Sequence, residues 1–215
     1  YVEGDVFQFN EEADRELSII EKEYDLFDIV FEENGKKGIK DIAGRIRVPA
    51  LYKDYSAVYF YTWGREYPVA AMNESNKFAL VDANGTGMPF CEFLYDSINY
   101  MFATNGFFIC AKIDGESVMR GVLNAKGEVL VPCEMDAICE MANNLIVLEK
   151  GGKYGFLTYD GVFGKPIYDD IEDELGLLRV CKNGVWGVVN VDCDFIAEDD
   201  EERMENEELL VLYSF

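Results

Sequence analysis

A chain of 215 residues with 19 basic and 42 acidic side chains carries a formal net charge of −23 and contains no histidine. Such a negative field repels phosphate backbones and anionic membranes, so we expect no nucleic acid and no membrane insertion, whereas a basic protein surface is an acceptable partner. The lack of histidine excludes Ser-His and Cys-His nucleophiles and histidine-ligated zinc.

The six cysteines form no C-x-x-C pair, and most lie in apolar runs such as "FFICAKI" and "LLRVCKN". This pattern is typical of buried free thiols in a reducing compartment, and the spacing supports neither a zinc site nor a redox pair. We therefore expect no metal and no cofactor. We expect a cytoplasmic location, with export as the alternative if a leader was removed.

The first stretch of the chain, "DVFQFNEEADRELSII", has two interpretations. One is a helix with Asn10 as its N-cap and an apolar face. The other is a degenerate half-unit at 5–23, in which "VFQF" and "ELSII" are strands. We favour the half-unit, because the segment leads into "YD" as the later copies do.

One spacing frame then recurs five times along the chain: a glycine is followed six residues later by a tight turn. The pairs are Gly38 and Gly44, Ala79 and Gly85, Gly121 and Gly127, Gly155 and Gly161, and Gly187 and Cys193. Successive frame positions lie 41, 42, 34 and 32 residues apart. Periods of this size indicate stacked or ring-like repeats.

Each copy of the frame predicts three strands. The first strand precedes an Asn-Gly or Gly-Gly turn, which suits a two-residue hairpin because both central residues need positive φ. The second strand carries the frame glycine, and the third ends at a proline, which cannot donate to a ladder. An aromatic residue or Met follows, usually beside an Asp that we expect to bond backbone amides in a turn.

The frame glycine leaves one face of its strand bare. We expect a flat ring from a neighbouring position to cover this bare backbone, while the residue before the glycine points to the opposite face. The pair Trp186-Gly187 is therefore interpreted first as a packing feature.

The segments "GKYGFLTYDGVFGKPIYDDI" and "NGVWGVVNV" resemble WG repeats, also called KWG repeats, which occur mainly in bacterial proteins. The family pattern is approximately G-K-W/Y-G-h-h-x-x-x-G-x-h-h-h-P-x-x-Y-D, where h is apolar, and the fourth copy follows it nearly throughout. The resemblance extends from about Tyr24 to Ile196, with departures at Ala79 and after Cys193, where the proline is missing. It implies an all-β repeat protein used for interaction, with no catalytic residues to carry over.

We therefore predict an all-β fold of consecutive three-stranded antiparallel repeats, arranged as a propeller-like closed ring or as an open array. The terminal "ELLVLYSF" resembles a first strand without a successor, and joining it to the N-terminal half-unit would close a ring. We assign 1–215 to a single repeat domain. Its predicted parts are the half-unit 5–23, repeats at about 24–55, 56–98, 99–138, 139–171 and 172–196, and an acidic segment with a final strand at 197–215.

The acidic run "AEDDEERMENEE" is predicted to be a solvated loop or a short helix. It lacks the Asp-x-Asp-x-Asp-Gly order of a calcium-binding loop.

The expected function is non-catalytic binding of another protein, because repeats offer extended modular surfaces. The candidate patch is "VYFYTWGREYP", which brings together Tyr59, Tyr61, Trp63 and Tyr67, and Tyr and Trp are enriched at binding hot spots. A buried strand of alternating aromatics is the alternative for this segment. Carbohydrate or cell-wall binding is the alternative function. A carboxylate-based hydrolase is less favoured, since the spacing singles out no pair of acids.

Overall fold

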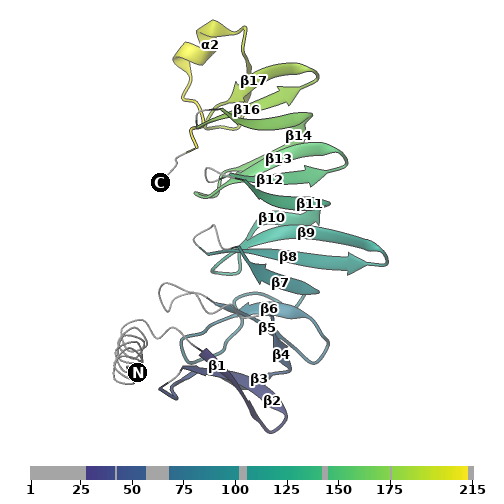
Figure 1. Cartoon of the computed structure of the whole chain (residues 1–215), viewed down its shortest axis with the longest axis vertical. Helices are drawn as coiled ribbons and strands as arrows, with labels where there is room; N and C mark the ends of the chain where they lie inside the picture. Colours follow the sequence, from purple (N-terminus) through teal and green to yellow (C-terminus); the bar gives the residue numbers. More distant parts are fainter. Residues whose placement is uncertain are drawn as a thin grey trace, which may run out of the picture. The chain divides into compact units, whose positions relative to one another are not determined.

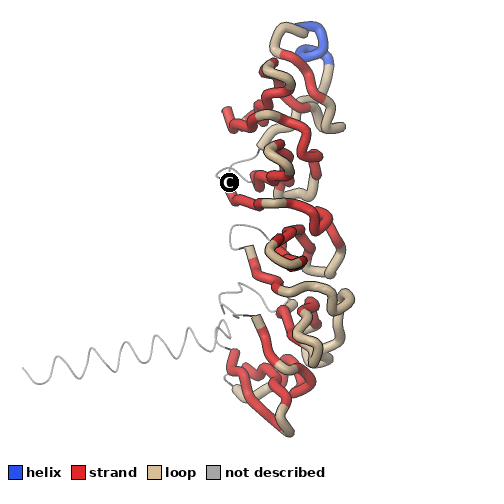
Figure 2. The backbone as a smooth tube through the Cα atoms, turned by 90° about the vertical axis from the view of Figure 1, so that its right-hand side faces the viewer, coloured by secondary structure: helices blue, strands red, loops and turns tan. Residues whose placement is uncertain are grey.

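The computed structural model describes residues 28–41, 43–56, 68–101, 106–141, 145–174 and 176–212. Strands dominate this part of the chain, which contains one short helix (Figure 1, Figure 2). The chain divides into two compact units, Tyr1–Leu94 and Tyr95–Phe215. The predicted half-unit at 5–23 lies outside the described residues, and the single repeat domain stays a prediction.

The first compact unit contains two three-stranded antiparallel sheets. The strands are β1 (Asp28–Glu33), β2 (Lys36–Asp41) and β3 (Ile46–Tyr52) in one sheet, and β4 (Asp54–Tyr55), β5 (Val69–Met72) and β6 (Phe78–Val81) in the other. Both sheets contribute to one core, in which Ile39 and Val48 cluster with Val69, Ala71 and Val81.

The second compact unit contains three four-stranded antiparallel sheets that follow one another in chain order (Figure 1). The strands are β7 (Ser97–Tyr100), β8 (Phe107–Asp114), β9 (Ser117–Asn124) and β10 (Val129–Met135); β11 (Ala137–Met141), β12 (Leu145–Lys150), β13 (Lys153–Thr158) and β14 (Phe163–Tyr168); and β15 (Asp170–Glu174), β16 (Leu177–Lys182), β17 (Val185–Val189) and β18 (Phe195–Ala197). Apolar side chains of successive sheets share common cores.

The second-unit sheets have one strand more than the sequence predicts. The segment after each Tyr-Asp or Met-Asp pair lies outside the three predicted strands, but it forms β7, β11 or β15 and pairs with the first strand of the next hairpin. The physical reason is the open edge of that first strand, whose backbone groups need partners. Each repeat is therefore a meander of four strands here.

The ring and the open array can now be distinguished. Each sheet consists of consecutive strands. The segment after α2 (Glu201–Asn206) forms bridges from Leu209 to Asn190 and from Val211 to Leu177, so it pairs within the last sheet. It therefore does not act as the first strand of a further repeat, and the structure supports the open array.

The second frame position has the same backbone conformation in all five repeats. Its φ angle is positive at Gly44, Gly85, Gly127, Gly161 and Cys193, with values of 82°, 107°, 77°, 96° and 65°. A positive φ is uncommon outside glycine. The recurrence at Cys193 confirms that the fifth copy follows the frame although its residue differs.

The hairpin turns agree with the sequence in three repeats. Both central residues have positive φ at Asn34-Gly35, Gly151-Gly152 and Asn183-Gly184. In the third repeat the sequence pair Asp114-Gly115 predicts the turn, but the turn lies one residue later, at Gly115-Glu116, with positive φ at Gly115. This is the type of hairpin in which glycine takes the first central position.

The frame glycines are covered in two different ways. At Gly38 a Cβ would meet the Phe31 ring at 2.6 Å, as predicted. At Gly187 it would meet the Phe195 ring at 2.6 Å, but the carbonyl oxygen of Ile196 on the third strand lies nearer still, so ring and backbone both cover this glycine. At Gly121 and Gly155 the ring prediction is wrong. There a Cβ would lie 2.6 Å and 2.5 Å from a carbonyl oxygen of the third strand, because β10 and β14 shift register and pass over the glycine.

The Asp residues of the junctions bond backbone amides, as predicted. Asp96 accepts from the Ile113 amide at 2.8 Å, Asp136 from Gly151 at 2.7 Å, and Asp169 from Gly184 at 3.3 Å. Each donor belongs to the hairpin of the following repeat. The aspartate thus links the end of one repeat to the hairpin tip of the next.

Candidate interaction surface on the fifth repeat

The predicted aromatic patch of Tyr59, Tyr61, Trp63 and Tyr67 lies outside the described residues, so it stays a prediction. The described residues present a second candidate on the fifth repeat. We define the acidic surface as eight exposed carboxylates: Asp192, Asp194, Glu198, Asp199, Glu201, Glu202, Glu205 and Glu208.

The turn between β17 and β18 holds the first part of the acidic surface. The side chain of Asn190 is buried, with 5% of the residue exposed, and its Oδ1 accepts from the amides of Asp192 at 3.1 Å and Asp194 at 2.8 Å. The amide of Cys193 donates to the Asn190 carbonyl at 2.9 Å. Asn190 therefore fixes the backbone that carries two of the acidic side chains.

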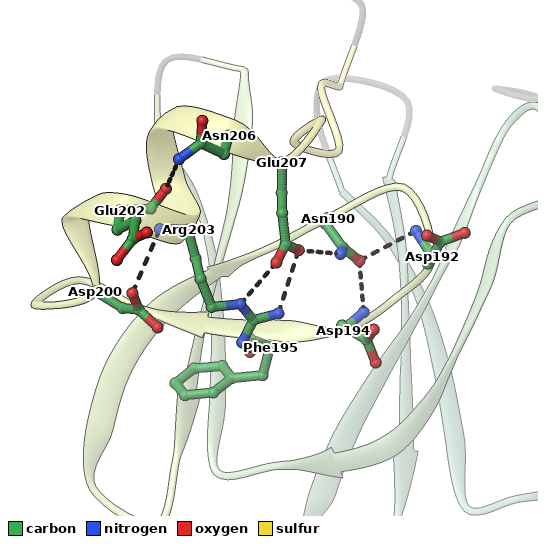
Figure 3. A network of polar contacts seen from close by, with 9 residues as sticks. All are labelled: Asn190, Asp192, Asp194, Phe195, Asp200, Glu202, Arg203, Asn206 and Glu207. Carbon is green, nitrogen blue, oxygen red and sulfur yellow. Dashed lines mark hydrogen bonds and ion pairs between the residues drawn. The ribbon is translucent and has the colours of Figure 1, made fainter.

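The helix α2 is tied to the same turn (Figure 3). Arg203 donates from Nε to Oε1 of Glu207 at 2.7 Å, and Asn190 donates from Nδ2 to Oε2 of the same carboxylate at 2.6 Å. Both hydrogen bonds lower the pKa of Glu207 below its ordinary value of 4.5, and the one from Arg203 has the larger effect. Glu207 thus joins the helix to the β17–β18 turn.

The start of α2 is also defined by side chains. Asp200 is the N-cap and accepts from the Arg203 amide at 3.3 Å. Glu201 and Glu202 occupy the first turn, where negative charge is favourable because the helix N-terminus carries partial positive charge. No residue of α2 is buried, which confirms the prediction of a solvated short helix in this run.

The segment that follows α2 returns to the core. The amide of Leu210 donates to the Val189 carbonyl at 2.8 Å, and that of Leu212 to the Gly176 carbonyl at 2.6 Å. Both leucine side chains are buried in the cluster that contains Tyr168 and Leu178. The acidic helix is therefore anchored on both sides, by the β17–β18 turn and by buried leucines.

Two hollows border this region. The first, of 460 Å³, is polar and is lined by Asn190, Val191, Asp192, Asp194, Arg203, Glu207 and Glu208. The second, of 330 Å³, is mostly apolar and is lined by Glu174, Leu177, Arg179, Val188, Glu198 and Met204. A basic side chain that entered the polar hollow would meet several carboxylates and one guanidinium.

Arg179 is already engaged by its neighbours. Its guanidinium lies 2.7 Å from Glu174 and 2.5 Å from Glu198, and it sits 5.0 Å from the ring centre of Trp186. Because these contacts neutralise the guanidinium locally, the acidic surface keeps its negative character beside it.

A polar residue three positions after the first frame residue is a feature that we did not recognise in the sequence. These residues are Asp41, Asp82, Asn124, Thr158 and Asn190, and each side chain accepts from the amide four residues later. Asx and hydroxyl turns of this kind favour Asp, Asn and Thr. The spacing D/N/T-x-x-G would have predicted the first four positions, and the fifth follows it with Cys193 in place of the glycine.

In the described part of the chain, no group of three or more Cys, Asp and Glu side chains is arranged to hold a metal ion. No described helix is long and apolar enough to cross a membrane.

The fold and its recurring glycine, turn and aspartate positions define an open β-repeat protein. Residues 121–154 match the model of the WG containing repeat. The match begins at the frame glycine of the third repeat and ends one residue before that of the fourth, so it covers one complete period. The resemblance suggested by the sequence is thus confirmed, and the chain carries a WG repeat of this family. A search of curated proteins finds no match to the chain.

Proposed function

We propose that this protein is a non-catalytic module that binds another protein, and that the acidic surface contacts a basic segment of that partner. The observation that carries the proposal is the anchoring of α2 by Glu207, which Arg203 and Asn190 hold in place. Repeat proteins offer fixed, extended surfaces on which exposed residues can vary. Here the fifth repeat holds acidic side chains on a fixed backbone.

Electrostatics favours a basic partner at this surface. Residues 198–208 contain eight acidic side chains and one basic side chain. That one cation, Arg203, is bound to Glu207, and the nearby Arg179 is bound to glutamates. Like charges at close range repel each other, so lysine or arginine side chains from a partner would relieve this repulsion and speed association.

The aromatic patch at 58–68 is the second predicted contact. A separate experiment tests this patch. Wild type and the Trp63→Ala variant are each immobilised, and the amounts of protein that they capture at physiological salt are compared. We expect reduced recovery of the captured partner. Unchanged recovery by a folded variant would remove the patch from the binding surface.

Carbohydrate binding needs aromatic rings that are open to a sugar. Trp186, the tryptophan that the structure describes, has the Arg179 guanidinium over its ring. This contact covers one face of the ring, so we do not propose sugar stacking at the fifth repeat.

A pair of charge-matched variants tests the acidic surface. The first replaces four of its carboxylates: Glu201→Gln, Glu202→Gln, Glu205→Gln and Glu208→Gln. The control removes the same number of charges from exposed positions elsewhere: Glu32→Gln, Glu33→Gln, Asp114→Asn and Glu116→Gln. Both variants have the same net charge, so they separate a local surface from the overall field.

The probe is a fluorescein-labelled oligolysine peptide, and its binding is followed by anisotropy at low and at physiological salt. We expect the acidic-surface variant to bind about fivefold more weakly than wild type, from a few exposed pairs of modest strength each. The control should change binding by less than about twofold. Equal weakening in both variants would mean that the peptide responds only to net charge, and the proposal would fail.

A further inference from the structure

Two cysteines that are far apart in the sequence meet in the third repeat. Cys110 lies on β8 and is paired with Gly121 of β9. Cys133 lies on β10, the strand on the other side of β9. The spacing in the sequence supports no redox pair, but the sheet places both cysteines beside the same glycine.

Gly121 is the reason why strands two places apart approach each other. Neighbouring strands are normally about 4.8 Å apart, so residues on alternate strands lie about twice that distance apart. Here β10 shifts register and passes over the glycine, and a Cβ on Gly121 would lie 2.9 Å from Cα of Cys133. The absent side chain leaves the space that Cys133 occupies.

The thiol of Cys133 reaches the backbone of Cys110 in this arrangement. Sγ of Cys133 donates to the Met119 carbonyl at 3.0 Å and lies 3.8 Å from the Cys110 carbonyl oxygen. Both cysteines are reduced in this structure.

The two thiols differ in exposure. Cys110 is buried, with 1% of the residue exposed, whereas Cys133 is partly exposed. Burial raises the pKa of Cys110 to about 12 and also raises the pKa of Cys133. Because the thiolate is the reactive form, oxidation should be slow at neutral pH and should begin at the more accessible Cys133.

We propose that Cys110 and Cys133 form an intramolecular disulfide when the folded protein meets a peroxide. The Cys133 thiolate attacks one peroxide oxygen, the O–O bond breaks, and the products are a sulfenic acid and, after protonation, water. The Cys110 thiol then displaces the hydroxyl group of the sulfenic acid, which leaves as a second water while the S–S bond forms. Two thiols are oxidised, and one hydrogen peroxide is reduced to two waters.

The disulfide would join β8 and β10, the two strands that flank β9 in the meander. Cross-links stabilise mainly by restricting the unfolded chain. For a loop of this length we expect the melting temperature of the second compact unit to rise by roughly 5–10 °C on oxidation.

The test uses the full chain, treated with hydrogen peroxide in the folded state and then blocked with N-ethylmaleimide. Non-reducing peptide mapping should show the Cys110 and Cys133 peptides joined, with the loss of two hydrogens. Cys133→Ser should abolish the link and the gain in melting temperature. Cys139→Ser is the matched control, because Cys139 is exposed on β11, and it should leave both unchanged.

Cys133→Ala is a second variant, which removes the thiol without placing a serine hydroxyl at the register shift of β10. Either substitution, if folded, must lose the cross-link. The proposal would be overturned if Cys133 were oxidised to a sulfinic acid while Cys110 remained a free thiol. Alkylation of Cys110 by N-ethylmaleimide under denaturing conditions would reveal that free thiol. A disulfide that joins either cysteine to a different partner would also overturn the proposal.

Discussion

The fourth and fifth repeats share a hairpin and a frame, but they end differently. In the fourth repeat, β14 passes Pro166 and reaches the buried Tyr168, and Asp169 then contacts the next hairpin. In the fifth, β18 has only three residues and no proline, and the chain enters an acidic helix. One frame thus supports either a link to another repeat or an anchored polar segment.

The largest expected effect concerns the anchor of the fifth repeat. Leu210→Ala removes a buried side chain from the core that Tyr168 also occupies, and we expect a loss of about 3 kcal/mol in the free energy of unfolding. Val211→Ala is the matched control, because Val211 is 44% exposed, and it should cost below about 1 kcal/mol. Urea denaturation measures both. Equal costs would show that the returning segment is not anchored by Leu210.

The two asparagines at the equivalent frame position give a smaller difference. Asn124 and Asn190 each accept from two turn amides and each donate to a glutamate, Glu128 or Glu207, but Asn190 is buried whereas Asn124 is only partly buried. We expect Asn190→Ala to cost about 2 kcal/mol and Asn124→Ala about 1 kcal/mol, because only the former leaves a buried network incomplete. Denaturant midpoints check this order, provided that the dependence of the unfolding free energy on denaturant concentration is the same in both variants. The reverse order would contradict the special role of the fifth repeat.

The smallest effect is a pH dependence at Glu207. Its folded pKa is lowered, so its contribution to stability is complete above the unfolded value near 4.5 and is lost as the pH falls through the folded value. The stability difference between wild type and Glu207→Gln should therefore shrink as the pH falls from 6 towards 3. Glu208→Gln, at an exposed neighbour, is the matched control. A difference that stayed constant with pH would argue against the ionic contacts of Glu207.

The sequence predicts the repeat architecture well because its signals are local. Turn glycines act within a few residues of themselves, and the structure bears out the turn glycine Gly161 and the backbone hydrogen bond of Asp169 at the fourth repeat. The prediction that the proline ends the third strand is wrong, because β14 continues past Pro166 to Tyr168 and shifts register along β13, so that the missing amide of the proline is tolerated. The sequence does not predict the additional strand of each second-unit sheet (β7, β11 or β15), because this strand forms only by pairing with the hairpin that follows it. This pairing depends on the neighbouring repeat and leaves little trace in the segment itself.

The sites depended on contacts that spacing does not encode. Asn190 and Glu207 are separated by an acidic run that looks solvated throughout, and only the fold brings them together. Cys110 and Cys133 meet because a register shift carries β10 over Gly121. We expected a ring over that glycine, so the approach of the third strand was not foreseen.

The central claim is that the fifth repeat holds its acidic segment on a fixed backbone. Amide hydrogen exchange of the free protein tests it most directly, because the amides of Leu210 and Leu212 donate to carbonyls of the last repeat. We predict that both amides exchange far more slowly than those of an unstructured peptide, as do the amides of β16 and β17. Exchange of both leucine amides at unstructured rates, with β16 and β17 still protected, would contradict the account.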